Sequence, residues 1–520
     1  MFNNELWQKP AGGAGGSGFY THQIASSIRN SASQNGTLKF TAGTPTSSKK
    51  FTMSYWIKRY DDSDTSSDNV VFTSGTGGGA YVFWSFSSSD FQMEGTGGGW
   101  TGYQKSDAKY RDVSSWYHHV ITFDSTQSTQ ADRIKIYVNG ERITSWSIIT
   151  IVGNISLNQD FAYINQNNVV QAFGGLSGVG HGVEGADLQM AEIVFNDGQS
   201  YGADSYGESK NGVWIPKDPS GLTFGNNGYY LKMAAGAIGT DSSGNSNNFS
   251  VNNISAHDQM LDSPTFNSDS NGGNMCTWNP LDAKNMAVPT EGNLSVDFSG
   301  TNYNQIRGTM SIGNSGKWYM ELYKSGTYAS YPAWGICDQN QKLTSSYTTP
   351  GYLAKAMAGI AWDFNANKVY KSLTYSESAS GTEIGTTANV YTTTAQIVGM
   401  AIDLDNNKIF THVDGTWDSG CGNPSSGGSG FDASGLSGVN NLVPVVLPSS
   451  VNSPAYVLVG GFGADSTFGG LTSAGSGTDA NGYGNFKYSV PTGYGAICQG
   501  NISTADAVDP AQTDDNYPQK

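Results

Sequence analysis

Hydrophobic and polar residues alternate along short segments of the chain, beginning at 51–59, FTMSYWIKR. Phe51, Met53, Tyr55 and Ile57 fall on one side of this segment. An alternation with a period of two residues is typical of a β-strand with one buried face. Similar segments predict further strands at 80–86, 116–124, 133–143 and 191–197.

Turn residues indicate how some strands are connected. Within 133–143, Asn139-Gly140 suits the type I′ turn of a β-hairpin, in which both central residues have positive φ. Residues 361–370 and 401–410 share Ala, Asp, Asn-Lys and an aromatic residue at an offset of 40. Because only two copies occur, they predict two similar hairpins of one sandwich rather than the blades of a propeller.

A second set of strands is predicted at 316–323, 333–338, 359–370, 397–415, 442–448, 455–463 and 490–497. Residues 201–290 separate the two sets and contain many turn residues but few predicted strands. We therefore predict an all-β fold of two antiparallel β sandwiches joined by an irregular connector. The predicted divisions are an N-terminal arm at 1–30, a first sandwich at 31–200, the connector at 201–290, a second sandwich at 291–500 and a C-terminal tail at 501–520.

The composition agrees with an all-β fold. Only 13% of the 520 residues are charged, whereas 68 are Gly and 12% are aromatic. Low charge with many aromatic residues excludes a disordered chain, and the scarcity of Glu, Lys, Arg and Leu excludes coiled coils. Trp56 and Trp318 lie in predicted strands, and we expect both to be buried.

The net charge of the chain excludes some classes of binding partner. The formal net charge is −16, and a nucleic-acid-binding protein needs a basic surface, so no nucleic acid is predicted as a partner. The sequence has no run of 18 apolar residues and no signal-peptide pattern, so neither membrane insertion nor secretion by that route is expected. The four Cys residues are at least 61 positions apart and are expected to be reduced and mostly buried rather than to bind zinc.

Four segments of the first 200 residues carry a resemblance to a known family. They read FTMSYWIK, SSWYHHVITFD, IKIYVNGERI and MAEIVFNDG. Their order and spacing resemble the laminin-G-like, concanavalin A-like sandwich over about residues 31–200. The resemblance implies two packed antiparallel sheets that often bind carbohydrate or protein at their loops, sometimes with calcium.

The second set of strands resembles a SPRY domain. The matching features are WY-E within 316–323, a Gly-rich middle strand, the hairpin G-x-x-x-D-x-D-x-x-x-x-I-x-F, the segment VP-x-V and a closing P-x-G-Y. The chain departs from the family at Thr411-His412-Val413-Asp414, where a Tyr-x-Asn-Gly turn is usual. Asp414-Gly415 still suits a turn, so the predicted sandwich is unaffected.

The succession of motifs in 201–290, which includes YGESKNGVWIPKDPSG, NGYYLKM and CTWNPLD, resembles a connector found in virion proteins of tailed bacteriophages. The resemblance implies a structural protein on the virion exterior, a tail fibre, spike or capsid fibre that is assembled in the host cytoplasm and binds a host-surface glycan or protein. The arm, with its flexible Gly12–Gly18 run, is then predicted to bind other virion proteins. A homo-oligomer such as a trimer is compatible with this role. The alternative is an architectural capsid or tail decoration protein with no receptor role.

Patterns of catalytic residues are weak, and we predict that the protein is not an enzyme. Gly198–Gly202 fits G-x-S-x-G, but the residues that follow lack the helical pattern that this nucleophile motif requires. Glu184, Asp187 and Glu192 do not form the E-x-D-x-E pattern with which related sandwiches place two carboxylates for glycan cleavage. A glycan depolymerase remains as a minor alternative.

No cofactor is predicted, with calcium as the alternative. Asp61–Asp68 and Asp241–Asn245 supply oxygen ligands without the spacing of an EF-hand, so solvated turns are the preferred interpretation. His118 and His119 are adjacent and would point to opposite faces of a strand, so they cannot share a metal ion. One is expected in the core and the other in solvent.

Aromatic residues in predicted loops are the candidate ligand-binding residues. Loops on a rigid sandwich commonly carry binding residues, and flat rings beside polar groups suit a sugar or a short peptide. The candidates are Trp100, Tyr103, Tyr347, Trp417, Asp418 and Asn423. The alternative is that these rings only hold long loops against the sandwich.

Overall fold

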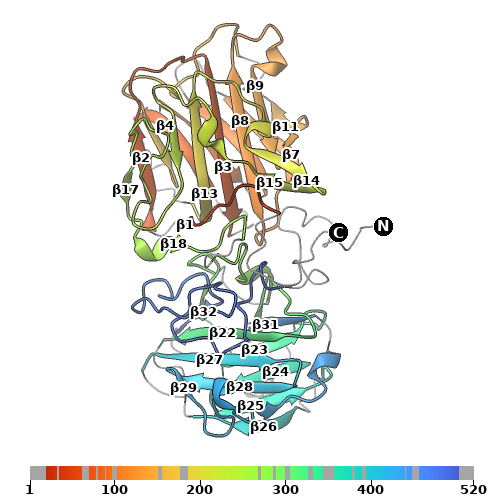
Figure 1. The fold of residues 1–520 in the computed structure, drawn as a ribbon. Coiled ribbons are helices and arrows are strands. Elements are labelled where there is room, and N and C mark those ends of the chain that lie inside the picture. Colours follow the sequence, from red (N-terminus) through yellow and green to blue (C-terminus); the bar gives the residue numbers. More distant parts are fainter. Residues whose placement is uncertain are drawn as a thin grey trace. The chain divides into compact units, whose positions relative to one another are not determined.

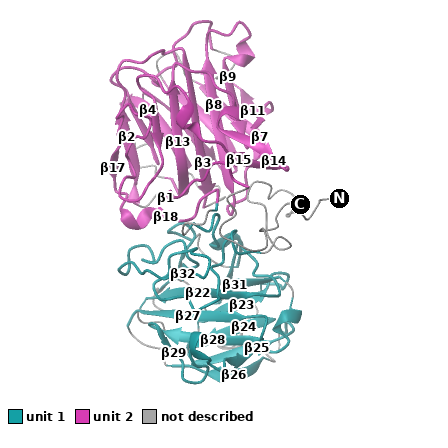
Figure 2. Ribbon diagram, viewed as in Figure 1, with its two compact units in different colours: residues 1–16, 266–508 teal, residues 17–265, 509–520 magenta. Residues whose placement is uncertain are grey.

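The computed structural model describes residues 19–31, 34–60, 69–77, 80–87, 89–96, 102–149, 155–175, 186–266, 271–284, 289–298, 305–325, 332–343, 357–376, 381–388, 390, 394–439, 441–447 and 456–502 (Figure 1). The described residues form two compact units, an N-terminal unit up to Thr265 and a C-terminal unit from Phe266 (Figure 2, magenta and teal). Each unit is built from antiparallel sheets, which confirms the predicted all-β fold. None of the helices in the described part of the chain has the length and hydropathy of a membrane span.

The N-terminal unit contains two eight-stranded sheets. Sheet 1 has the order β10 (Glu141–Arg142), β9 (Ile134–Val138), β8 (Trp116–Asp124), β3 (Lys50–Arg59), β13 (Leu188–Asp197), β1 (Ser27–Asn30) and β18 (Gln259–Met260), with β16 (Tyr229–Leu231) paired to β13. Sheet 2 has the order β11 (Trp146–Ile149), β7 (Gly102–Lys109), β6 (Asp90–Thr96), β5 (Ala80–Ser87), β4 (Asn69–Gly77), β12 (Val170–Phe173), β2 (Thr37–Thr41) and β17 (Ser250–Asn252). A separate hairpin joins β14 (Gly207–Lys210) to β15 (Val213–Pro216), and the short 3₁₀ helices are η3 (Gln130–Asp132), η6 (Ala203–Ser205), η7 (Pro219–Gly221) and η8 (Ala256–Asp258).

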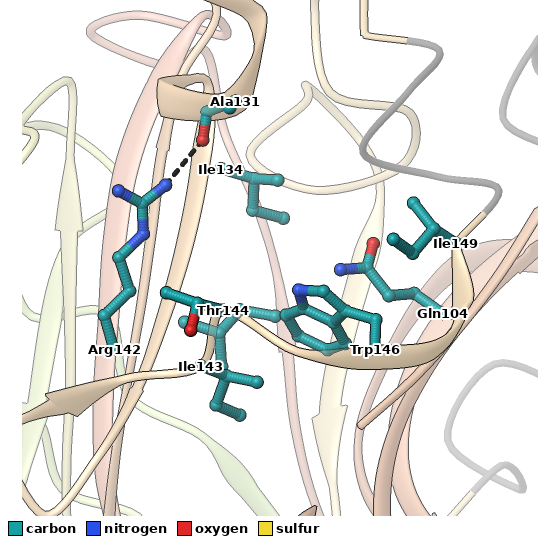
Figure 3. A pocket seen from close by; sticks show the side chains of 9 residues that line it. Gln104, Ala131, Ile134, Arg142, Ile143, Thr144, Trp146 and Ile149 are labelled. Atoms are coloured by element: carbon teal, nitrogen blue, oxygen red, sulfur yellow. Dashed lines mark hydrogen bonds between the residues drawn. The ribbon is translucent and has the colours of Figure 1, made fainter. Parts of the chain in front are cut away.

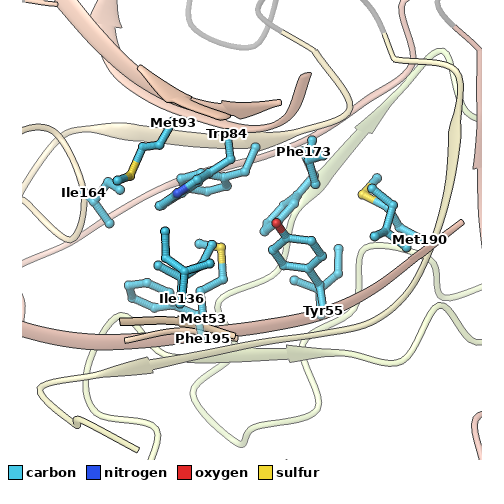
Figure 4. Close-up of a cluster of buried hydrophobic side chains, with 14 of the residues drawn as sticks. Met53, Tyr55, Trp84, Met93, Ile136, Ile164, Phe173, Met190 and Phe195 are labelled. Atoms are coloured by element: carbon cyan, nitrogen blue, oxygen red, sulfur yellow. The ribbon is translucent and has the colours of Figure 1, made fainter. Parts of the chain in front are cut away.

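The core of this unit lies between sheets 1 and 2. Figure 4 shows Met53 and Tyr55 of sheet 1 close to Trp84 and Met93 of sheet 2, and all four side chains are fully buried. As predicted, the alternating residues of β3 share the core face. Trp56 is only 3% exposed, in agreement with its predicted burial, and the whole face of β3 on which it lies is buried as well, so β3 is not the half-buried strand that the alternation indicated.

The opposite face of β3 is covered by segments that are remote in sequence. Trp214 of β15 packs with Trp56 and with Ile24. The predicted Asn139-Gly140 turn is present, with φ of 47° and 85°, and the indole of Trp214 lies so close that a Cβ on Gly140 would be 2.4 Å from it. The glycine therefore serves both the turn and the packing of the β14–β15 hairpin.

The structure corrects the predicted irregular connector at 201–290, because strands within this segment belong to the sheets of the two units. Within 201–265, β16 pairs with β13, β17 pairs with β2 and β18 pairs with β1, so this stretch completes the N-terminal unit. Residues 271–284 belong to the C-terminal unit, where β19 (Trp278–Lys284) pairs with β21 (Gln305–Gly308). The predicted arm at 1–30 is corrected in part, because β1 is a sheet strand, while residues 1–18 lie outside the described chain. The strands β16, β17 and β18 have only two or three residues, too short for alternation to reveal them.

The C-terminal unit contains two seven-stranded sheets. Sheet 3 has the order β19, β21, β31 (Leu442–Leu447), β23 (Ala333–Asp338), β24 (Gly359–Asp363), β25 (Lys368–Ser372) and β26 (Thr382–Thr386). Sheet 4 has the order β20 (Ser295–Phe298), β32 (Tyr456–Gly461), β22 (Lys317–Lys324), β27 (Gln396–Asp403), β28 (Lys408–Val413) and β29 (Thr416–Trp417), with β30 (Phe431–Asp432) paired to β28. The 3₁₀ helices are η9 (Pro424–Ser426) and η10 (Leu436–Gly438).

Local predictions for this unit are confirmed except at one strand. The two similar hairpins are β24–β25 in sheet 3 and β27–β28 in sheet 4. Trp318 is 7% exposed, in agreement with its predicted burial, and the four Cys residues are free and buried. Residues 490–497 form no regular strand, and Gly495 makes only an isolated parallel bridge to Trp318.

Candidate functional site

A pocket of about 340 Å³ opens at one edge of the N-terminal sandwich (Figure 3). It lies between β9 and β10, which end sheet 1, and β7 and β11, which end sheet 2. The residues that line this edge pocket are Gln104, Ala131, Ile134, Ile136, Arg142, Ile143, Thr144, Trp146 and Ile149. None of the nine carries a carboxylate, an imidazole or a thiol.

The alternation of side chains along β9 explains which residues form the floor of the edge pocket. Ile134 and Ile136 are 3% and 2% exposed, whereas Lys135 and Tyr137 between and after them point away. The Asn139-Gly140 turn then returns the chain through β10 to Ile143, whose amide donates a hydrogen bond to the carbonyl of Ile136 (2.8 Å). The hairpin therefore supplies an apolar floor.

The opposite wall comes from β11, the edge strand of sheet 2. Ile149 pairs with Gln104 and Ile148 pairs with Lys105, and the register shifts between Trp146 and Ile148. Because successive residues point to opposite faces of a sheet, Ile149 lines the edge pocket and Ile148 does not. Ile149 and Ile148 are 54% and 40% exposed.

Polar groups lie at the rim and at one point of the floor. The guanidinium of Arg142 donates hydrogen bonds to the carbonyl of Ala131 (2.6 Å, dashed in Figure 3) and to Oδ1 of Asp132 (3.2 Å). Asp132 also pairs with Lys135 (3.5 Å). Gln104 also lines the floor, and its side chain is fully buried.

The predicted site residues of the N-terminal unit lie elsewhere. Trp100 is outside the described residues. Tyr103 precedes Gln104 on β7 and so points to the opposite face of sheet 2, where its hydroxyl donates a hydrogen bond to Oε1 of Gln92. It is partly exposed and does not line the edge pocket.

In the C-terminal unit, Tyr347 is outside the described residues. Trp417 is partly exposed, and its ring meets the edge of His412, with ring centroids 4.9 Å apart. Asp418 is 4% exposed, and its carboxylate accepts hydrogen bonds from the Thr411 hydroxyl and the Ala388 amide (both 2.5 Å). Asp418 therefore faces the interior and is removed from the candidate ligand-binding residues. Asn423 is exposed, and its Oδ1 accepts from the Ser425 amide (2.8 Å) as the N-cap of η9.

Both histidines of the His118–His119 pair are buried, so the prediction that one faces solvent is wrong. His118 stacks on Trp56, its Nδ1 accepts a hydrogen bond from the Trp214 indole N–H (2.9 Å), and its Nε2 is hydrogen-bonded to the Ser54 hydroxyl (2.8 Å). Burial lowers the pKa of His118 and of His119 to about 3 each, so both rings are neutral at physiological pH. They serve packing on the two faces of β8.

The carboxylate and serine patterns are also accounted for locally. Glu192 lies in β13, where its Oε2 is 2.6 Å from His22 Nε2 and 3.3 Å from the Tyr230 hydroxyl. Glu184 is outside the described residues. Ser200 lies in an exposed turn, followed only by the three-residue helix η6.

Of the two acidic loops considered for calcium, Asp61–Asp68 is outside the described residues. In the other, Asp241 Oδ1 accepts from the amides of Tyr230 and Ser243, and Oδ2 accepts from Asn247 and the Ser243 hydroxyl. The carboxylate of Asp241 therefore stabilises the turn in which it lies. Within the described ranges, no group of three or more Asp, Glu, His or Cys side chains is placed to hold a metal ion.

The sequence did not predict the edge pocket. The available signal was the largely apolar run Trp146-Ser147-Ile148-Ile149, which only Thr144-Ser145 separate from the predicted hairpin. Which of its side chains would face a cavity depends on the register with β7, which pairs residues about 40 positions apart.

Comparisons with known proteins agree with the architecture. Residues 32–176 match the family described as the Concanavalin A-like lectin/glucanases superfamily. No curated protein matches the chain.

Similar solved structures include domains LG4-5 of the mouse laminin alpha1 chain, at 11% identity, 87% of this chain, 93% of that chain and a TM-score of 0.27. The SPRY domain of human HERC1 matches at 12% identity over 35% of this chain and 96% of that chain, with a TM-score of 0.25. A putative carbohydrate binding protein from Bacteroides ovatus matches at 17% identity over 45% of this chain and 60% of that chain, with a TM-score of 0.31.

Proposed function

We propose that this protein binds glycans without cleaving them, through the edge pocket of its concanavalin A-like N-terminal sandwich. The observation that carries the proposal is the pocket itself, an indole and four isoleucines with polar groups at the rim, within a domain whose family is named for lectins and glucanases. Glycoside hydrolysis uses a pair of carboxylic acids. The lining residues carry none, which favours the lectin over the glucanase alternative.

The size of the edge pocket indicates a small epitope. Ligand pockets typically measure about 300–1,000 Å³, so a volume of about 340 Å³ suits one or two sugar residues of a longer glycan. Such a site binds weakly alone, and useful affinity would come from several copies on one particle. Tyr103, Trp417 and Asn423 are further candidates for contacts with a longer chain.

For the setting, we propose the exterior of a tailed-bacteriophage virion, where the protein would act as a tail fibre, spike or capsid fibre toward a host-surface glycan or protein. The support is the succession of motifs in 201–290, and the binding partners inside the particle would be other virion proteins. An architectural decoration protein is the alternative, in which no glycan is bound.

The test uses the full-length protein and Trp146→Leu on an array of bacterial surface glycans. Leucine keeps an apolar contact with the core but removes the aromatic ring, so thermal unfolding should be nearly unchanged while glycan binding falls. Release of reducing sugar from the bound glycan would favour the depolymerase. Absence of binding to any glycan, together with antibody labelling over the whole capsid surface of particles, would favour the architectural alternative.

A further inference from the structure

We infer that the edge pocket takes a 6-deoxyhexose residue of the glycan, with the methyl group at C6 turned toward the apolar walls. The inference rests on the proposed glycan-binding function and names the class of sugar. It follows from the apolar surface inside the pocket and from the polar groups at its opening.

The surface inside the edge pocket is supplied by apolar side chains. Ile134 and Ile136 close the base and are 3% and 2% exposed. Ile149 is 54% exposed and Trp146 is half-buried, and Figure 3 shows both beside the same space as Ile134. Gln104 also lines the floor, but at 0% exposure it offers a ligand no accessible polar atom. A group that enters the pocket therefore meets mainly apolar surface.

Such walls distinguish a methyl group from a hydroxymethyl group. Common hexoses carry a hydroxymethyl group on C5 of the ring, and a 6-deoxyhexose carries a methyl group at the same place. A hydroxyl group that leaves water without a new hydrogen bond is penalised, whereas a methyl group gains free energy when it leaves water. Because the two sugars are otherwise identical, the walls select the deoxy sugar through this one oxygen atom.

The opening of the pocket suits the hydroxyl groups of the sugar ring. Arg142 and Thr144 are exposed there. The guanidinium of Arg142 donates hydrogen bonds to Ala131 and Asp132, and it has more N–H donors than these bonds use, so donors remain for ring hydroxyls. The same bonds hold the guanidinium in place, so less freedom is lost when a ligand binds. The ring can thus keep its hydroxyl groups at the opening while its methyl group lies inside.

Neighbouring isoleucines of β11 provide a matched pair of variants. Ile149→Ser replaces an apolar wall of the pocket with a hydroxyl group. Ile148→Ser makes the same change on the same edge strand, on the face that does not line the pocket. Both side chains are exposed, at 54% and 40%, so neither change should unfold the protein, and thermal unfolding of each variant checks this point.

The full-length protein and both variants are titrated with pairs of sugars that differ only by the oxygen at C6, using calorimetry and saturation-transfer NMR. The pairs are L-rhamnose with L-mannose, L-fucose with L-galactose, and 6-deoxy-D-glucose with D-glucose. We expect at least one 6-deoxy sugar to bind about tenfold more tightly than its counterpart, with the strongest saturation at its methyl group. In Ile149→Ser this preference should fall to about twofold or less, because the new hydroxyl group can bond to the oxygen at C6, and Ile148→Ser should keep the wild-type preference.

Three results would overturn the inference. Equal affinity within every pair would show that the oxygen at C6 is not recognised, while glycan binding stays in place. A preference for 6-deoxy sugars that persists in Ile149→Ser would place their recognition outside the edge pocket. Binding of no sugar in these titrations would exclude the 6-deoxyhexoses. The glycan array then decides the proposed function, which stands if Trp146→Leu reduces binding there and fails if no glycan binds.

Discussion

The buried ion pair between Lys58 and Asp262 gives the most direct test of how the N-terminal unit is built. Lys58 lies on β3, and Asp262 lies in the segment that the sequence predicted to be an irregular connector. The Lys58 Nζ is 2.7 Å from Asp262 Oδ2, with side-chain exposures of 0% and 1%. The indole N–H of Trp116 donates to the other oxygen, Oδ1, at 2.9 Å.

The perturbation is Asp262→Ala. It removes the carboxylate that neutralises a buried ammonium group, and breaking a buried pair from one side destabilises a protein by about 3–5 kcal/mol. The matched control is Asp132→Ala, which breaks the exposed pairs to Arg142 and Lys135 at the rim of the edge pocket. Because Asp132 is 37% exposed, water screens these charges, and a change below about 1 kcal/mol is expected.

The assay is denaturant unfolding of the full-length protein, with hydrogen–deuterium exchange used to assign each transition to a unit. Asp262→Ala should destabilise the N-terminal unit and leave exchange in the C-terminal unit unchanged. If Asp262→Ala destabilises no more than Asp132→Ala, Asp262 is not buried against sheet 1. The segment 201–265 would then be a connector after all.

Three further predictions follow from the structure. A fragment of residues 31–200 should fail to fold because it lacks strands of both sheets, whereas a fragment of residues 19–265 should show cooperative thermal unfolding by circular dichroism; equal behaviour of the two would contradict the assigned boundary. Burial raises the pKa of Glu321 from 4.5 to about 7, so the folded state binds more protons than the unfolded state between these values, and the stability of the C-terminal unit should fall by about 3 kcal/mol as pH rises from 4.5 to 7. Glu321→Gln should flatten this pH dependence in urea titrations, and an unchanged slope would assign it to another group. Trp56→Ala and Trp318→Ala should each destabilise their own unit by about 3–5 kcal/mol in denaturant unfolding, and an effect below about 1 kcal/mol would show that the strand is misplaced.

Much of the fold could be predicted because the relevant signals are local. The alternation along 51–59 reflects the pleat of a strand, in which every second side chain shares a face. The Asn139-Gly140 turn and the two hairpins offset by 40 positions are decided by residues that tolerate positive φ. These features need no knowledge of the partner strand.

The candidate site could not be predicted in the same way. Aromatic residues near glycine indicated loops, yet Tyr103 lies on the face of sheet 2 away from the edge pocket. Asp418 is polar and was expected at the surface, but two hydrogen bonds hold it in the interior. Polarity alone does not distinguish a group that serves a ligand from one that satisfies the fold.

By itself, the sequence determined the class of the fold, the position of the long strands and the location of the tight turns, because each depends on the conformational preferences of a few consecutive residues. Only the tertiary structure decided that both faces of β3 are buried, that residues 201–265 complete the N-terminal unit and that an apolar pocket opens between β10 and β11. These features depend on pairings such as that of β17 with β2, which lie more than 200 residues apart. The free energy of such contacts comes from surfaces that meet only after the chain has folded, so no local pattern records them.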